Sequence, residues 1–250
     1  MQLRVMTYNI HRAIGVDRRF RPERIRRVVD HHRPDVLLLQ EVDEGAPRSR
    51  ELDLAKELAT LLGFPHYAVG HNVALRKGRY GNATLSRHPI LRERNIDLTV
   101  DARKRRGCQH TRIRVESRRG RPYVMDAFNL HLGLSAWERA RQVGMLARSG
   151  EFNSLEAGQA CLVAGDFNDW RSLLHPIFTE ILSFRSATQH PVRWDRAIRT
   201  YPAFSPRGSL DRIYYRGPLR MLSSRACRMR VSKVASDHLP VIADFELHGP

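Results

Sequence analysis

The stretch Leu162-Val163-Ala164-Gly165-Asp166-Phe167-Asn168 joins an apolar run to two polar side chains. The apolar part is typical of a buried strand, which we expect over residues 160–165. In an extended chain Asp166 and Asn168 point the same way, while Phe167 points to the other side. The sequence therefore predicts a carboxylate and a carboxamide side by side at the end of a buried strand.

These two side chains suit either of two kinds of local structure. Carboxylate and amide oxygens are hard ligands that favour Mg²⁺ or Mn²⁺, and an amide can also hold a phosphoryl oxygen. Asp and Asn are equally common after strands because they form Asx turns. From these residues alone, Asp166 is a candidate direct metal ligand, and the Asx turn stays open as the alternative.

Around this stretch, strand and helix patterns alternate in some parts of the chain and strand follows strand in others. The third expected helix directs Trp137, Ala140, Val143 and Ala147 inward. This order predicts mixed sheets with helices on the outer faces. The absence of repeats and linkers predicts one domain over residues 1–250, and we expect a monomer. The expected strands are 3–8, 35–40, 66–75, 81–87, 91–100, 109–116, 121–131, 160–165, 210–216 and 239–247, and the expected helices are 22–33, 50–63, 135–148 and 173–183.

The chain is strongly basic. Its 250 residues include 43 Lys and Arg against 26 Asp and Glu, a net charge of +17, and all but four of the cations are arginines. Such an excess favours anionic partners: nucleic acid, an anionic lipid surface or a small phosphorylated molecule. The alternative is that arginine is simply the preferred cation and is spread over every face, in which case no specific partner follows.

Apolar segments and cysteines bear on location. The longest buried-looking run is Val36 to Leu39, which predicts no integral membrane association. Polar residues interrupt the start of the chain, so we expect no secretory signal. Three widely spaced cysteines without a C-x-x-C pair argue against a disulfide framework and a cysteine zinc site. A cytoplasmic location is therefore expected.

Two further segments carry groups suited to proton transfer. Ser236-Asp237-His238 precedes the final strand, and an imidazole has a pKa suited to general base work. Adjacent residues face different ways, so Asp237 cannot easily orient His238, and we expect Asp211 to do so. A simple loop hydrogen bond between Asp and His is the alternative. Glu41 follows an apolar run directly and is either functional or a surface carboxylate.

Other polar side chains also lie at strand ends. Asn9 ends the first expected strand, and Asn82 begins another. Asn129 and His131 alternate with apolar neighbours and should project from one side of their strand, where His131 could donate to a phosphoryl oxygen. A buried core histidine is the alternative for His131, and a turn is the alternative for Asn82.

Taken together and in this order, the motifs resemble the endonuclease/exonuclease/phosphatase superfamily, whose members include deoxyribonuclease I, abasic-site endonucleases, sphingomyelinases and inositol polyphosphate 5-phosphatases. The resemblance runs from residue 2 to about residue 247 and is strongest to a bacterial branch. The matching segments are Thr7 to His11, Glu41, Gly81 to Arg87, Arg106-Gly107, Gly165 to Trp170, Leu210 to Tyr214 and Ser236 to His238.

The resemblance implies a DNase I-like α/β fold, a four-layer α-β-β-α sandwich of two mixed sheets with helices outside. It also implies site roles. Glu41 would hold the divalent metal, Mg²⁺ or Mn²⁺, with Asn9 and Asp237 close by. His238, oriented by Asp211, would activate water. The remaining implied residues position water and the phosphoryl group, namely Asp166, Asn168 and His131.

Substrate contacts and substrate class are less determined. Arg103-Lys104-Arg105-Arg106 is unusually cationic, because the related branch carries an acidic residue where Lys104 stands. The run either clamps an anionic substrate or is a solvated loop. We expect the solvated loop for Arg103 and Lys104 and a phosphate contact for Arg106. Asn82 and Tyr201 are the other candidate substrate-binding residues, and the alternative for Tyr201 is packing.

The expected function is hydrolysis of a phosphodiester or phosphomonoester by a metal-dependent enzyme, with a nuclease as one candidate. A phosphatase or phosphodiesterase acting on phospholipids or inositol phosphates is the other candidate on the same core. A non-catalytic basic module that binds nucleic acid is the alternative of a different class. It predicts salt-dependent binding without metal-dependent turnover.

Overall fold

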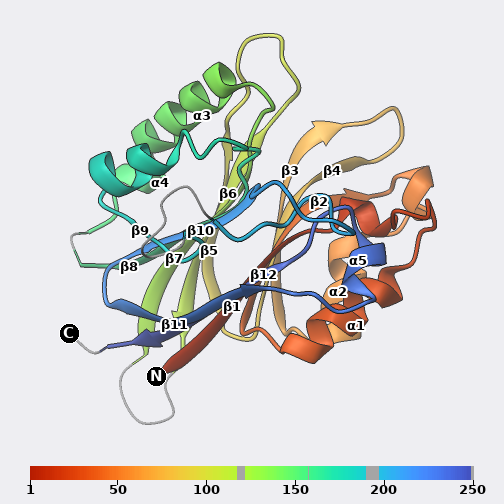
Figure 1. Ribbon diagram of the computed structural model, residues 1–250, viewed down its shortest axis with the longest axis horizontal. Coiled ribbons are helices and arrows are strands. Elements are labelled where there is room, and N and C mark those ends of the chain that lie inside the picture. Colours follow the sequence, from red (N-terminus) through yellow and green to blue (C-terminus); the bar gives the residue numbers. More distant parts are fainter. Residues whose placement is uncertain (117–121, 157, 190–196, 249–250) are drawn as a thin grey trace.

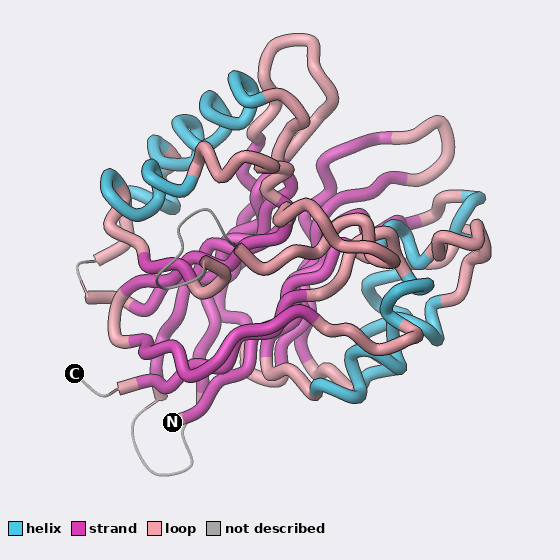
Figure 2. The backbone as a smooth tube through the Cα atoms, viewed as in Figure 1, coloured by secondary structure: helices cyan, strands magenta, loops and turns pink. Residues whose placement is uncertain are grey.

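Two six-stranded β-sheets pack face to face, and helices cover their outer sides (Figure 1). The computed structural model describes residues 1–116, 122–156, 158–189 and 197–248. Figure 2 shows the strands together in the middle, with helices on both sides. This arrangement confirms the predicted four-layer α-β-β-α sandwich.

The first sheet contains both ends of the described chain. Strands β1 and β2 run parallel, and every other neighbouring pair is antiparallel, so the sheet is mixed. In spatial order its strands are β11 (Leu219–Ala226), β12 (Val241–Leu247), β1 (Gln2–Asn9), β2 (Val36–Glu44), β4 (Arg79–Ser86) and β3 (His66–Ala74).

The second sheet is mixed in the same way, with β7 and β8 as its parallel pair. Its central strands end at the same edge as β1 and β2, and the candidate site lies there. In spatial order its strands are β5 (Ile90–Asp97), β6 (Gly107–Val115), β7 (Tyr123–His131), β8 (Ala160–Asp166), β10 (Asp211–Arg216) and β9 (Arg185–Ser186).

Three apolar cores correspond to the three contacts between four layers. Along β2, Leu38 faces the other sheet, while Leu37 and Leu39 face the helices. Along β8, Leu162 belongs to the core between the sheets and Val163 to the core beneath the outer helices. Because strand side chains alternate between faces, strands covered on both faces read as continuous apolar runs.

The helices lie in two groups, one on each sheet (Figure 1). The side chain of Asp53 caps α2, Gly63 ends it in a left-handed conformation, and Ser135 caps α3. The helices over the first sheet are α1 (Pro22–His32), α2 (Leu54–Leu62) and α5 (Ser232–Ala235), those over the second are α3 (Ala136–Arg148) and α4 (Gly150–Asn153), and the short helical turns are His11–Ala13, Pro47–Ser49 and Ile177–Ile181.

The predicted inward face of α3 is right for Val143 and wrong for Trp137 and Ala140. Trp137 is 51% exposed, and Ala140 is exposed as well. The buried face instead carries Arg139 and Gln142 beside Val143. These polar side chains are buried because each has a partner: Gln142 accepts from the Gly133 amide at 2.8 Å, and Arg139 donates to the Leu134 carbonyl at 2.7 Å. The apolar pattern alone could not reveal those partners.

Two other expectations need correction. The helix expected over 173–183 is reduced to an irregular turn at Ile177–Ile181, preceded by Pro176, which lacks the backbone N–H that a regular helix needs. Strand β11 was not expected, because its exposed polar residues hide the strand pattern. Residue 121, the start of one expected strand, lies outside the described residues.

Within the described ranges, the helices are all too short or too polar to cross a bilayer.

Candidate active site

Three neighbouring strands of the second sheet bring polar side chains to one edge. His131 ends β7, Asp166 ends β8 and Asp211 begins β10. His131 is in register with Asp166 across the β7–β8 pair, and Asp166 is in register with Asp211 across the β8–β10 pair. Residues in register project to the same face of a sheet, so an imidazole and two carboxylates form one row.

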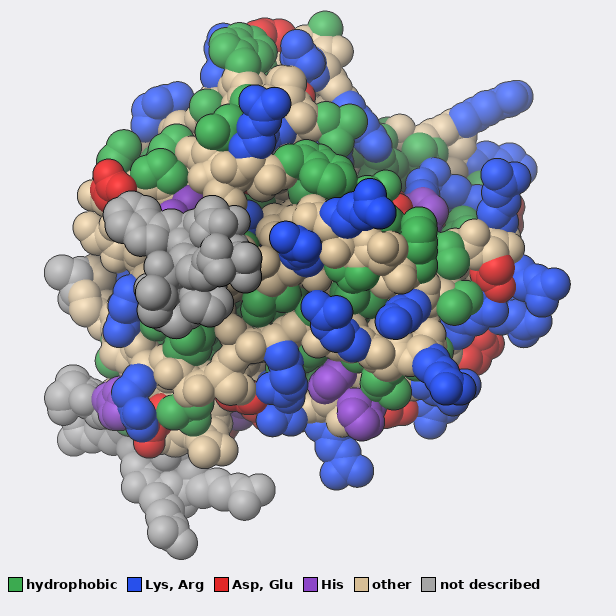
Figure 3. Space-filling view, in the orientation of Figure 1, with side chains coloured by type: hydrophobic (Ala, Val, Ile, Leu, Met, Phe, Trp, Pro, Cys, Tyr) green, Lys and Arg blue, Asp and Glu red, His purple; other side chains and the backbone are tan. Residues whose placement is uncertain are grey.

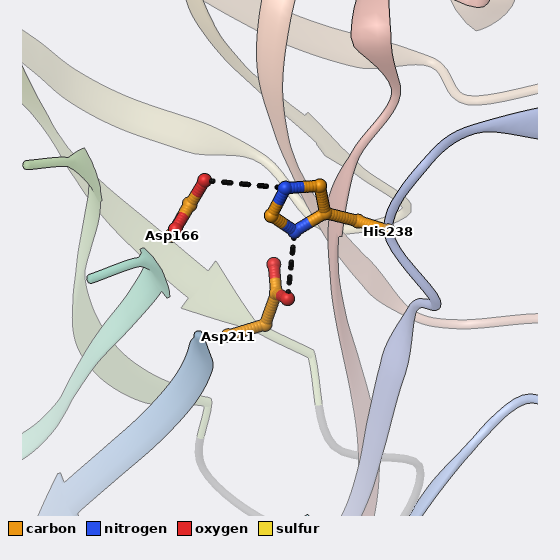
Figure 4. A group of neighbouring side chains, drawn as sticks. All are labelled: Asp166, Asp211 and His238. Atoms are coloured by element: carbon orange, nitrogen blue, oxygen red, sulfur yellow. Dashed lines mark hydrogen bonds and ion pairs between the residues drawn. The ribbon is translucent and has the colours of Figure 1, made fainter. Parts of the chain in front are cut away.

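His238 reaches this row from the loop before β12, on the other sheet (Figure 4). Its Nδ1 lies 2.9 Å from the Asp211 Oδ2, and its Nε2 lies 3.7 Å from the Asp166 Oδ2. All three side chains are buried. The structure therefore places His238 between the two carboxylates, with Asp211 rather than Asp237 as its hydrogen-bond partner.

The backbone of the His238 loop is held by the end of β1. The Ser236 hydroxyl donates to the Asn9 carbonyl at 2.7 Å and accepts from the His238 N–H at 3.1 Å. The Ala203 N–H donates to the Asp237 carbonyl at 2.7 Å. These contacts position the imidazole before any substrate arrives.

Asp166 and Asn168 are close together, but not as an extended chain would place them. Asn168 has a φ of +50°, and its N–H donates to the Asp166 Oδ1 at 2.9 Å, which is the Asx turn left open as the alternative. The Asn168 amide donates to the Leu132 carbonyl at 2.9 Å. The other Asp166 oxygen accepts from Asn9 Nδ2 at 3.0 Å, which links the two sheets at the site.

The buried charges shift one another's protonation. Burial lowers the pKa of His238, but the carboxylates of Asp211 and Asp166 outweigh it and raise this pKa to about 10. Burial raises the pKa of Asp166 to about 6, against the opposing pull of the His238 cation. Burial and then the Arg106 charge hold the pKa of His131 well below its ordinary value. At neutral pH, His131 is therefore a neutral imidazole.

Glu41 is aimed by an irregularity in β2. The pairing of β2 with β4 shifts between Leu39 and Val42, and Glu41 has a φ of +57°. Such bulges turn a side chain away from the regular alternation, often next to active sites. The Glu41 Oε2 is buried, makes no hydrogen bond and lies 3.4 Å from the Arg12 Nε. Glu41 is thus not the surface carboxylate of the alternative.

A small cavity of about 10 Å³ connects Glu41 with His131. This is about the room that one water molecule or one small ion needs. Arg106, 6% exposed, contributes a buried Nε without a hydrogen-bond partner. The cavity is lined by Glu41, Asn72, Val73, Tyr80, Gly81, Asn82, Arg105, Arg106 and His131.

Two sets of donors fit a divalent cation. Ligand atoms of Asp166, Asp211 and His238 lie within 4.8 Å of one another, in the described part of the chain. Glu41 lies outside this group, but it lines a cavity of ion size, and within the described residues its buried Oε2 makes no hydrogen bond and pairs only with Arg12. A hard cation such as Mg²⁺ prefers carboxylate oxygens, whereas the His238 Nδ1 is already bonded to Asp211. The donor chemistry therefore fits Glu41 as a ligand better than His238.

The remaining predicted residues lie around this centre. Asp237 is partly exposed, with its Oδ1 4.0 Å from the His11 Nδ1. The Tyr201 ring lies 5.0 Å from the His238 ring. The Asn82 amide donates to the carbonyls of Gly107 and Asn129 and ties β4 to the second sheet. Asn129 and His131 share the inner side of β7, as the alternation predicts.

Sequence reasoning missed Arg12 and Trp170. Arg12 stands beside Glu41 in a turn whose three residues all have positive φ. Trp170 packs against Tyr201 with ring centroids 5.6 Å apart. The available signal was position in the chain: Arg12 lies shortly after Asn9, and Trp170 lies shortly after Asn168. With 39 arginines in the chain, this signal could not single out Arg12.

Comparisons with known proteins agree with this architecture. The chain is 33% identical to YbhP of Escherichia coli, over 98% of this chain and 96% of that protein. Among solved structures, the catalytic domain of human Nocturnin with bound sulfate has a TM-score of 0.75 at 22% identity, covering 99% of this chain and 95% of that one. A mannosyl-6-phosphatase of Bacteroides thetaiotaomicron has a TM-score of 0.73 at 17% identity, covering 98% and 100%.

At these identities the solved structures establish the fold alone. The family assignment comes from a family model, the Endonuclease/Exonuclease/phosphatase family, which matches residues 6–238. That range includes every candidate catalytic and metal-binding residue from Asn9 to His238. The chain belongs to the endonuclease/exonuclease/phosphatase family.

Proposed function

We propose that this protein hydrolyses a phosphoester with the help of a divalent metal, using water activated by His238. The observation that carries the proposal is the position of His238: one ring nitrogen is bonded to Asp211 and the other faces Asp166. The names of similar structures, a mannosyl-6-phosphatase among them, support phosphoester chemistry in general.

His238 acts as the general base in its neutral form, which the raised pKa makes the minor form at neutral pH. When Nδ1 carries a proton, its N–H donates a hydrogen bond to Asp211, and Nε2 is left as an acceptor for a water proton. As the proton arrives, the two carboxylates stabilise the imidazolium, which is the same effect that raises its pKa. Proton transfer of this kind typically contributes about 10²- to 10⁴-fold to the rate.

Asp166 positions the attacking water. One of its oxygens is held by the Asn168 N–H and the other by Asn9, so the carboxylate cannot rotate freely. Its Oδ2 lies 3.7 Å from the His238 Nε2 and 3.5 Å from the His131 Nε2. A water held against this oxygen is within reach of the base, and the Asn168 turn keeps the carboxylate in place.

His131 and Arg106 stabilise the phosphoryl oxygens. His131 is neutral at physiological pH and can donate one N–H without adding charge. Arg106 lines the same cavity with its planar guanidinium, a geometry suited to phosphate. Asn82 lines the same cavity, and Tyr201 lies beside His238.

Glu41 would hold Mg²⁺ or Mn²⁺, with Asn9 and Asp237 nearby. The buried Glu41 oxygen makes no hydrogen bond and lies beside an ion-sized cavity, which supports this role. The Arg12 Nε lies 3.4 Å from that oxygen, so the arginine must either move away or share the oxygen with the metal ion. Bound metal supplies a Lewis acid that neutralises charge on the phosphoryl oxygens and the leaving group.

The test is a turnover screen of the purified protein with Mg²⁺ or Mn²⁺, each with an EDTA control. The panel contains plasmid, an abasic oligonucleotide, RNA, phospholipid vesicles, inositol phosphates and a chromogenic phosphodiester. We expect metal-dependent release of product from at least one class. Salt-sensitive binding to nucleic acid, with no turnover across the whole panel, would instead favour the non-catalytic basic module.

A further inference from the structure

Exposed apolar side chains gather on the segments that surround the candidate site. Among the described residues, eleven large hydrophobic side chains are exposed, and five of them lie within residues 134–137, 170–173 and 201–208, on the segments that follow β7 and β8 or precede β10. We call these five the loop rim: Leu134 (73% exposed), Trp137 (51%), Trp170 (53%), Leu173 (51%) and Phe204 (66%). Large apolar side chains clustered at a surface mark interaction sites.

Buried polar contacts join the first segments of the loop rim. Arg139, only 4% exposed, donates to the Leu134 carbonyl and lies 3.6 Å from the Asp169 carboxylate. Asp169 in turn accepts from the Leu173 N–H at 3.1 Å. Leu134 and Leu173 are therefore held on one framework.

Aromatic contacts join the rest of the loop rim to the catalytic centre. The Trp170 ring contacts the Tyr201 ring, and the Tyr201 ring lies 5.0 Å from the ring of His238. Gly208 lies directly against Trp170, where any Cβ would come within 2.6 Å of the indole. Phe204 is on the same loop as Tyr201 and Gly208. These contacts thus link the segments that carry Trp170 and Phe204 to His238.

The surface around the loop rim is cationic. Arg103 and Arg141 stack on Trp137, 5.6 and 4.9 Å from its ring centroid. Within residues 99–106, 134–141, 169–173 and 199–208, Asp101 is the one exposed acidic residue. Figure 3 shows hydrophobic and basic side chains mixed over α3 and the neighbouring loops, with few acidic ones. The exposed basic residues of these segments are Arg103, Lys104, Arg105, Arg141, Arg171, Arg199 and Arg207.

We propose that the loop rim docks on an anionic phospholipid bilayer and presents the catalytic centre to phospholipid headgroups. Exposed apolar tips among basic residues are the combination that binds an anionic membrane surface. Single-stranded nucleic acid could stack on Trp170 and Phe204, but it fits the whole rim less well, because Leu134 and Leu173 offer no ring and guanidinium groups already lie on Trp137. The reaction that docking would serve rests on the proposed function, whereas binding to the bilayer does not depend on it.

Binding is measured with the His238→Ala variant, so that turnover does not alter the vesicles. Flotation with phosphatidylcholine vesicles is compared with flotation on equimolar phosphatidylcholine and phosphatidylglycerol. We expect binding to the anionic vesicles that is at least tenfold stronger than to neutral ones and that weakens in 0.5 M NaCl. Equal binding to both vesicle types, or binding to neither, overturns the proposal.

A double substitution tests the loop rim itself. Leu134→Ser with Phe204→Ser should reduce binding to anionic vesicles at least tenfold. Leu91→Ser with Leu222→Ser removes exposed leucines elsewhere and should leave binding unchanged. Circular dichroism and thermal melts check that both variants fold. Equal losses of vesicle affinity in the two double variants contradict the proposal. So does a rim variant that keeps its affinity for vesicles but loses affinity for a single-stranded oligonucleotide.

The outcome separates this inference from the proposed function. If wild-type protein shows metal-dependent turnover of a soluble phosphodiester while His238→Ala binds no vesicles, the docking proposal fails and the hydrolase proposal stands. If no substrate turns over but the loop rim binds anionic vesicles, the hydrolase proposal fails and docking stands.

Discussion

His238 and Asp211 are 27 residues apart in the chain and belong to elements of different sheets, yet Nδ1 of the imidazole lies 2.9 Å from Oδ2 of the carboxylate. Both side chains are buried, and Asp211 is the first of the opposing charges that raise the pKa of His238. The pair can therefore control both the orientation and the protonation of the proposed base.

Asp211→Asn should lower the maximal rate by about 10²- to 10⁴-fold, because the imidazole loses the partner that fixes its tautomer. It should also move the rising limb of the pH–rate profile to lower pH. The sign follows from the charge: the Asp211 anion raises the pKa of His238, so removing it lets the base become neutral at lower pH. The measurement is kcat against pH at saturating metal. A limb that stays in place, or moves to higher pH, would contradict this coupling.

Glu41→Gln should raise the Mg²⁺ concentration needed for the half-maximal rate, because a neutral amide is a weaker ligand than a carboxylate. Glu44→Gln is the matched control on the same strand, where Glu44 pairs with Arg79 and His71 instead. Titrations of rate against Mg²⁺ compare the two. An unchanged titration for Glu41→Gln would remove Glu41 from the metal site.

Gly165→Ala should destabilise the protein and displace Asp166. Gly165 has a φ of +140°, and a Cβ there would come within 1.9 Å of the Leu130 carbonyl oxygen. Overpacking of this kind costs about 1–3 kcal/mol or more. Gly144→Ala in α3 is the control: its Cβ would meet nothing closer than 3.4 Å, and alanine in a helix gains about 0.5–1 kcal/mol. Urea unfolding of both variants should show opposite signs, and equal effects would rule out this account of Gly165.

His32 should make stability depend on pH. Burial lowers its pKa from 6.5 to about 4, and its Nε2 has no hydrogen-bond partner. Between pH 6.5 and about 4 the unfolded chain binds a proton that the folded chain does not, so stability falls as pH falls through this window. His32→Leu should remove most of that fall, whereas His31→Leu, which removes only the smaller charge contribution of an exposed neighbour, should reduce it less. Thermal melts between pH 8 and pH 4 measure it, and parallel curves for all three proteins would contradict the assignment.

Much of the fold could be predicted from the sequence because its strands are buried on both faces. Runs such as Val36 to Leu39 and Cys161 to Ala164 are typical of strands covered on both faces, and the helices between them carry side-chain caps. The face of α3 could not be predicted, because its buried side is polar and depends on partners such as Asp169 that are distant in the chain.

The candidate site was predictable at strand ends and less so in its loops. Asp166, Asp211 and His131 follow from strand register, which alternation indicates. The Asx turn at Asn168 was one of two structures that the sequence left open. The bulge that aims Glu41 depends on positive φ at a non-glycine residue, for which the sequence carries no signal. Arg12 shows the same limit, since its position depends on a turn of three such residues.

The central claim is metal-dependent hydrolysis through His238, and one kinetic comparison tests it most directly. Wild type, His238→Ala and the control His66→Ala are assayed on the best substrate of the screen, with Mg²⁺ and with EDTA, after thermal melts confirm folding. We predict that EDTA abolishes turnover and that His238→Ala loses at least about 100-fold while His66→Ala does not. A folded His238→Ala variant that keeps near-wild-type, metal-dependent turnover would contradict the account.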